Sequence, residues 1–122
     1  MIVPEPPDNL TYSLDSDNAR VLLSWDYNTL SDFNNKRYAE YRSAAEKPEI
    51  KGLELFRARL MLSDDACRGC PLDFARISSI AFPISEYREP IEKGFVYFYK
   101  ARYYTDHNIL SQFSETVEVE FQ

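Results

Sequence analysis

Residues 94–104 read Gly-Phe-Val-Tyr-Phe-Tyr-Lys-Ala-Arg-Tyr-Tyr, and this stretch decides the fold of the chain. In an extended segment, successive side chains point to opposite faces. One face of this stretch consists of Phe95, Tyr97, Tyr99, Ala101 and Tyr103. The other face consists of Val96, Phe98, Lys100, Arg102 and Tyr104. This alternation predicts a strand that is buried on one side, and its aromatic content places it at the centre of a β-sandwich.

Shorter alternating segments lie on both sides of the central stretch, with turn-forming residues between them. The predicted strands cover residues 10–14, 19–26, 53–62, 74–82, 84–88 and 116–122. Trp25 is the only tryptophan, and we expect it in the core because burial of its large ring contributes a few kcal/mol. The apolar positions change parity near Phe56, which predicts a β-bulge there. About seven strands without crossover helices predict an all-β, immunoglobulin-like antiparallel sandwich.

The composition indicates one domain, residues 1–122, and argues against several classes of function. Hydrophobic residues make up 44% of the 122 residues, enough to form an independent core. The formal net charge of −6 repels phosphate backbones, so nucleic acid is not an expected partner. No apolar run reaches the roughly 20 residues of a membrane-spanning helix, so this segment should not insert into a membrane. The N-terminus shows no signal peptide, but one could have been removed, so its absence says little about the compartment.

Two segments interrupt the strand pattern. Residues 27–51 form a long polar insertion, in which residues 37–46 could be helical up to the helix-ending Pro48. Residues 63–73 form a second loop, which contains both cysteines. Long connections in compact domains are often functional, so both segments are of interest.

Cys67 and Cys70 allow three interpretations. A structural zinc site needs four ligands, and because His107 is the only histidine, closing one would require carboxylates or a second subunit. A redox-active pair needs the start of a helix in a βαβ unit, which the sequence does not predict. The remaining interpretation is a disulfide in an oxidising compartment or two thiols in a reducing one. We therefore treat the pair as a disulfide candidate and expect no metal and no cofactor, with weak metal binding as the alternative.

No catalytic site can be assembled from the sequence. His107 has Asp106 beside it, but neighbouring side chains on an extended segment point apart. No nucleophile motif accompanies the histidine. The 20 acidic residues are scattered and include no calcium-binding loop. We therefore expect a protein that is not an enzyme.

Aromatic residues on the outer face of the central strands indicate a binding surface. Alternation places Phe56, Phe98 and Tyr104 on the solvent side, with Arg102, Lys100 and Arg59 expected nearby. Aromatic and arginine enrichment is typical of protein interfaces. The first hypothesis is that Phe56, Phe98, Arg102 and Tyr104 bind a protein partner of unknown identity or form a homodimer; the chain could also act only as a spacer. The second is that residues 27–51 fold back and cover these side chains.

A different class of function is also open. Exposed tyrosines stack on sugar rings in carbohydrate-binding accessory modules, and Tyr104, Tyr41 or Tyr38 could do so here. Aromatic rings grouped on one flat surface would favour a sugar, whereas a patch around Phe56 and Phe98 would favour a protein.

The order of several short motifs resembles the fibronectin type III domain across nearly the whole chain. These motifs are Pro6-Pro7, Val21-x-Leu23-x-Trp25-Asp26, Gly52-Leu53-x-Leu55, Gly94-x-x-Tyr97-x-Tyr99-x-Ala101, Ser111-x-x-Ser114 and Val117-x-Val119. The resemblance implies that Tyr97 is a tyrosine-corner residue, whose hydroxyl bonds to the preceding connection while its ring packs inside. Trp25, Tyr97 and Tyr99 are the structural core residues on this interpretation. Arg57 departs from the family, which tends to keep an apolar inward residue at that position.

The cysteine loop has a further, looser resemblance. Cys67-Arg68-Gly69-Cys70-Pro71 is similar to an element of fibronectin-type domains in exported bacterial lipoproteins. This similarity implies a periplasmic or cell-envelope location, with a cytoplasmic one as the alternative. The loop after Tyr104 contains no Arg-Gly-Asp sequence, so integrin-type adhesion is not implied.

Overall fold

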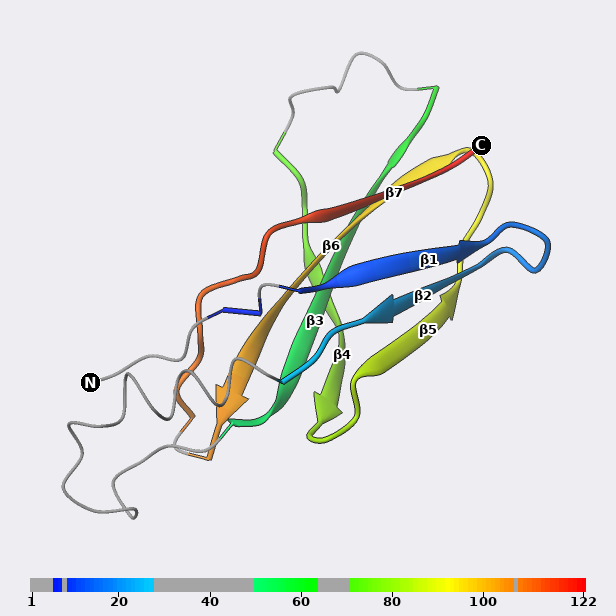
Figure 1. The fold of residues 1–122 in the computed structure, drawn as a ribbon. Helices are drawn as coiled ribbons and strands as arrows, with labels where there is room; N and C mark the ends of the chain where they lie inside the picture. Colours follow the sequence, from blue (N-terminus) through cyan, green and yellow to red (C-terminus); the bar gives the residue numbers. More distant parts are fainter. Residues whose placement is uncertain (1–5, 8, 28–49, 64–70, 107) are drawn as a thin grey trace, which may run out of the picture.

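Two antiparallel sheets face each other in the computed structural model, which describes residues 6–7, 9–27, 50–63, 71–106 and 108–122 (Figure 1). The strands are β1 (Thr11–Asp15), β2 (Arg20–Ser24), β3 (Ile50–Met61), β4 (Ala75–Ala81), β5 (Glu86–Pro90), β6 (Phe95–Thr105) and β7 (Val117–Phe121). One sheet has the order β1-β2-β5 and the other has the order β4-β3-β6-β7. The prediction of an all-β antiparallel sandwich is confirmed.

The central stretch of the sequence forms β6, which pairs with β3 on one side and β7 on the other. The predicted third strand begins earlier than expected, at Ile50, so the end of the predicted insertion belongs to β3. Residues 28–49, where the helix was predicted, lie outside the described residues, as do Cys67, Cys70 and His107.

The core lies between the two sheets, where the inward residues of β6 meet those of β2. Tyr97, Tyr99, Ala101 and Tyr103 are buried, as alternation along β6 requires. Trp25, which follows β2, is 4% exposed and belongs to the same core cluster as Tyr99. The tryptophan segment and the tyrosine-rich strand therefore lie in facing layers.

The predicted irregularity near Phe56 is present, but the extra residue is in β4. The register between β3 and β4 shifts between Leu55 and Phe56, which leaves Ile77 of β4 without a register partner. Strand β3 keeps its alternation against β6, so Arg57 and Arg59 lie opposite the inward residues of β6. The placement of Arg59 beside the outer patch is therefore wrong: its guanidinium lies 4.5 Å from the centre of the Phe95 ring.

Tyr97 has the geometry of a tyrosine corner. The backbone N–H of Glu92, in the connection before β6, donates a 2.8 Å hydrogen bond to the Tyr97 hydroxyl oxygen, and the ring is buried. This bond ties the turn between β5 and β6 to the core. Gly94 in the same turn has a φ of +92°, a conformation that glycine adopts without steric cost.

We expect Tyr97→Phe to lower the free energy of unfolding by about 1–2 kcal/mol, because the Glu92 N–H would lose its partner. Urea unfolding measures the change. Tyr12→Phe is a matched control, since Tyr12 is 46% exposed on β1, and should have almost no effect. Equal stability of the Tyr97→Phe and wild-type proteins would contradict the tyrosine-corner assignment.

Candidate binding face of the four-stranded sheet

The outer face is the side of the β4-β3-β6-β7 sheet turned away from the three-stranded sheet. Its side chains on β3 and β6 include Glu54, Phe56, Ala58, Phe98, Lys100, Arg102 and Tyr104. The four residues predicted to form a binding patch therefore share one face. They are half-buried, not fully open to solvent.

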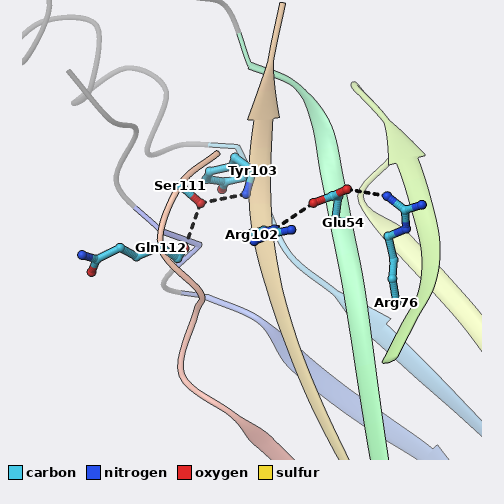
Figure 2. Close-up of polar contacts among 6 residues, drawn as sticks. All are labelled: Glu54, Arg76, Arg102, Tyr103, Ser111 and Gln112. Carbon is cyan, nitrogen blue, oxygen red and sulfur yellow. Dashed lines mark hydrogen bonds and ion pairs between the residues drawn. The ribbon is translucent and has the colours of Figure 1, made fainter. Parts of the chain in front are cut away.

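A further aromatic residue reaches this face because two serines hold the loop after β6. Ser111 and Ser114 accept hydrogen bonds through Oγ from the backbone N–H groups of Tyr103 and Ala101, at 2.8 and 3.0 Å. Their own backbone N–H groups donate to the carbonyls of the same two residues. Figure 2 shows Ser111 turned toward Tyr103. The loop therefore follows β6 closely and places Phe113 on the outer face.

Two cations and three aromatic rings are interleaved on the outer face. Lys100 lies between Phe74 and Phe113, and Arg102 lies beside the edge-to-face pair of Phe113 and Phe56, whose ring centres are 4.9 Å apart. We call these five residues the cation–aromatic row. The Lys100 ammonium lies 4.3 Å from the Phe74 ring centre and 4.1 Å from that of Phe113. The Arg102 guanidinium lies 4.9 Å from the Phe113 ring centre and 5.1 Å from that of Phe56. Each such contact stabilises by roughly 0.5–1 kcal/mol at an exposed site. The side chains of the row therefore support one another on the outer face.

Glu54 links the cation–aromatic row to β4. Its carboxylate accepts hydrogen bonds from Arg76 Nη1 at 2.7 Å and from Arg102 Nε at 2.8 Å. Figure 2 shows the three side chains in one line across β6, β3 and β4. Burial tends to raise the pKa of the Glu54 carboxyl, but the hydrogen bonds and charges of the two arginines outweigh this effect and lower the pKa below its ordinary value of 4.5.

The lowered pKa predicts a pH-dependent contribution to stability. Because the folded-state pKa lies below the unfolded one, the contribution is fully present above about pH 4.5 and is lost as the pH falls through the folded-state pKa. We expect Glu54→Gln to cost about 1–3 kcal/mol at pH 7, the range for hydrogen bonds to charged groups, and less at pH 3. Urea unfolding at both pH values measures the difference. Glu118→Gln, an exposed change on β7, is the control, and a pH-independent cost for Glu54→Gln would contradict the prediction.

Tyr104 lies over a glycine at the end of the outer face. Gly52 is its register partner on β3, and a Cβ added there would collide with the Tyr104 ring and with the Ile80 backbone carbonyl. Beside the ring is a hollow of about 270 Å³ that is lined by Glu54, Ser79, Tyr104, Asn108 and Leu110. Sequence reasoning identified Tyr104 but not the hollow, since its lining comes from segments far apart in the chain.

Several predicted features cannot be placed. Tyr38 and Tyr41, like both cysteines and His107, lie outside the described residues. Within the described residues, no group of three or more histidine, cysteine or acidic side chains could hold a metal ion. The same part of the chain contains no helix long and apolar enough to cross a membrane.

Comparison with known proteins gives structural neighbours only. No family model matches the chain, and a search of curated proteins finds no match. Among solved structures, an Fn3-like protein from Clostridium thermocellum superposes with a TM-score of 0.61 over 99% of this chain and 96% of that one, at 15% identity. The third fibronectin III domain of human KIAA0343 protein gives a TM-score of 0.61 over 98% of this chain and 83% of that one, at 11% identity. The chain has the fibronectin type III fold.

The two antiparallel sheets and the tyrosine corner at Tyr97 are both features of sandwiches of this kind. A structure titled as a myokine also superposes, with a TM-score of 0.57 over 97% of both chains and 16% identity. At such identities the similarity concerns the fold alone. The predicted resemblance to fibronectin type III domains is confirmed at that level, and the link to bacterial lipoproteins stays a prediction.

Proposed function

We propose that this chain is a non-catalytic protein-binding module and that the outer face is its binding surface. The cation–aromatic row is the observation that supports the proposal, because it combines aromatic rings and arginine on a face whose side chains remain partly open to solvent. Fibronectin type III domains as a fold are consistent with a non-catalytic role.

The distribution of charge on the outer face favours a second copy of this chain as the partner. Lys100 and Arg102 form a cationic line on β6, and Glu118 and Glu120 form an exposed acidic line on the adjacent β7. A two-fold axis lying in the plane of the contact, midway between the two charged lines, would place the acidic line of one copy over the cationic line of the other. Such self-complementarity is what an isologous dimer requires.

Sedimentation velocity with Phe98→Ser tests this function. Phe98 lies between the two charged lines, opposite Glu118 in the β6–β7 register. We expect the wild type to dimerise and the variant to dissociate at least about tenfold more readily, a change of about 1.4 kcal/mol. Tyr12→Ser, on the other sheet, should leave the association unchanged.

Two results of this experiment would count against the proposed dimer or its binding face. A wild type that stays monomeric at all concentrations would contradict the dimer. If Phe98→Ser also lowered the stability of that monomer by several kcal/mol, the outer face would be covered by the chain itself, as the second sequence-based hypothesis holds.

We also propose that the module belongs to an exported or cell-envelope bacterial protein, with Cys67 and Cys70 joined in a disulfide. The resemblance of the Cys-Arg-Gly-Cys-Pro loop supports this location. The genomic sequence upstream of Met1 tests it: a signal peptide followed by a lipobox cysteine is expected. A thiol count on the purified protein should find both cysteines blocked until a reductant is added, and two free thiols would contradict the disulfide.

A further inference from the structure

The hollow beside Tyr104 has the size and lining of a small ligand site. Its lining comes from β3, β4, β6 and the loop after β6, so the fold itself assembles it. Its volume of about 270 Å³ is slightly below the roughly 300 Å³ at which the usual range for ligand pockets begins. A single ring therefore suits it better than an extended molecule.

The apolar part of the hollow is held in place before any ligand arrives. The phenol end of Tyr104 lies directly over Gly52, a position that only a residue without Cβ leaves open. Leu110, which is 40% exposed, forms a β-bridge with Tyr104 and borders the same space. An aromatic ring fixed on one side and bordered by an aliphatic side chain is a suitable surface for the C–H face of a sugar ring.

The polar part of the hollow offers both acceptors and donors. Glu54 is kept ionised by Arg76 and Arg102, and each of its oxygens has a second lone pair beyond the one used by arginine. The Ser79 hydroxyl and the Asn108 side-chain amide can each donate and accept. Sugar hydroxyls require this mixture. An acidic ligand would meet the Glu54 carboxylate, and the charge of that carboxylate is already paired with two arginines, so a neutral ligand fits best.

We propose that this hollow binds one neutral pyranose ring of a glycan. The C–H face of the ring rests on Tyr104, and its hydroxyls bond to Glu54, Ser79 and Asn108. The site goes beyond the proposed protein-binding function, since it lies at the loop end of the outer face and requires no second copy of the chain.

A titration of the ¹⁵N-labelled full chain with neutral gluco-, manno- and galacto-configured hexasaccharides tests the proposal by NMR. We expect saturable chemical-shift changes at Ser79, Tyr104, Asn108 and Leu110 with at least one of them. Asn108→Gly removes the amide and keeps the left-handed backbone, whose φ is +58°, so this variant should fold normally. Loss of one hydrogen bond, in Asn108→Gly or in Ser79→Ala, should raise the Kd by about 2–10-fold.

The aromatic surface has its own variant and control. Tyr104→Leu should abolish binding, whereas Tyr12→Leu, which changes an exposed tyrosine on the opposite sheet, should leave the Kd unchanged. Absence of saturable shifts with every hexasaccharide would overturn the proposal, and so would an unchanged Kd in both Asn108→Gly and Ser79→Ala. A monomeric wild type that still binds the sugar would contradict the dimer and leave the sugar site standing.

Discussion

Replacing Glu89 with alanine is expected to lower the free energy of unfolding by about 3 kcal/mol, the lower end of the range for breaking a buried ion pair, because the Arg57 side chain left behind is 32% exposed. Glu89 is 8% exposed on β5, yet it points between the sheets. Arg57 Nη1 of β3 lies 2.7 Å from Glu89 Oε1, and the Tyr99 hydroxyl of β6 donates to Oε2. The carboxylate thus joins three strands from both sheets. Its removal would leave a guanidinium and a hydroxyl without their partner.

The protonation of the neighbouring groups agrees with this arrangement. Burial raises the pKa of the Tyr99 hydroxyl, and the adjacent Glu89 raises it further, so the tyrosine stays protonated and keeps donating. Burial tends to lower the pKa of the Arg57 guanidinium, but the hydrogen bond and charge of Glu89 outweigh this effect and raise it. The two side chains therefore act as fixed donors to one carboxylate.

Chemical unfolding of Glu89→Ala, Arg57→Met and the double variant measures the coupling. Glu86→Ala, on the exposed side of the same strand, is the matched control and should cost little. The double variant Arg57→Met/Glu89→Leu should recover much of the loss, because apolar replacement of a whole buried pair is often close to neutral. A cost below about 1 kcal/mol for Glu89→Ala would contradict the prediction, because it would mean that the Glu89–Arg57 pair contributes no more than an ordinary surface ion pair.

Replacing Trp25 with alanine should have an effect at least as large, about 3–5 kcal/mol, because a large ring would leave a cavity at the centre of the core. Trp25 is 4% exposed, and its backbone N–H donates to the Ser85 carbonyl, so the main chain cannot easily move into the cavity. Circular dichroism should follow the unfolding, since the variant has no tryptophan to report by fluorescence.

Trp25→Phe provides the control for the Trp25 prediction. The indole Nε1 is buried near the Tyr27 hydroxyl but makes no hydrogen bond of normal geometry among the described residues, and that hydroxyl keeps its bond to the Ile84 carbonyl when Trp25 becomes phenylalanine. We expect the loss for Trp25→Phe to be less than half of that for Trp25→Ala. If Trp25→Phe and Trp25→Ala lowered the free energy of unfolding equally, the indole N–H, and not the volume of the ring, would decide the stability.

Much of the fold could be predicted because alternation is a local property. The faces of β6, the order of the strands and the irregularity opposite Phe56 were all visible in the sequence. The inward direction of Arg57 was also visible, but only as a departure from the family pattern. Its partner was not, since nothing in residues 84–88 or their surroundings marks Glu89 as an inward carboxylate.

The candidate face was predictable only in part. Phe56 and Phe98 followed from strand parity, whereas Phe74 and Phe113 lie outside strands, where parity does not apply. The Ser111-x-x-Ser114 spacing was the only sequence feature that pointed to Phe113. The two serines fix the loop only because the backbone of β6 lies beside them and donates hydrogen bonds to their hydroxyls.

By itself, the sequence determined which residues of the central strand β6 face inward, since side chains alternate at every step of an extended chain. It therefore determined the all-β sandwich and the burial of Tyr97, Tyr99 and Tyr103. The tertiary structure alone decided which distant side chains meet: Arg57 with Glu89, Glu54 with Arg76, and Ser79 with Tyr104. Such meetings depend on the register between strands, which arises only when the sheets pair and pack.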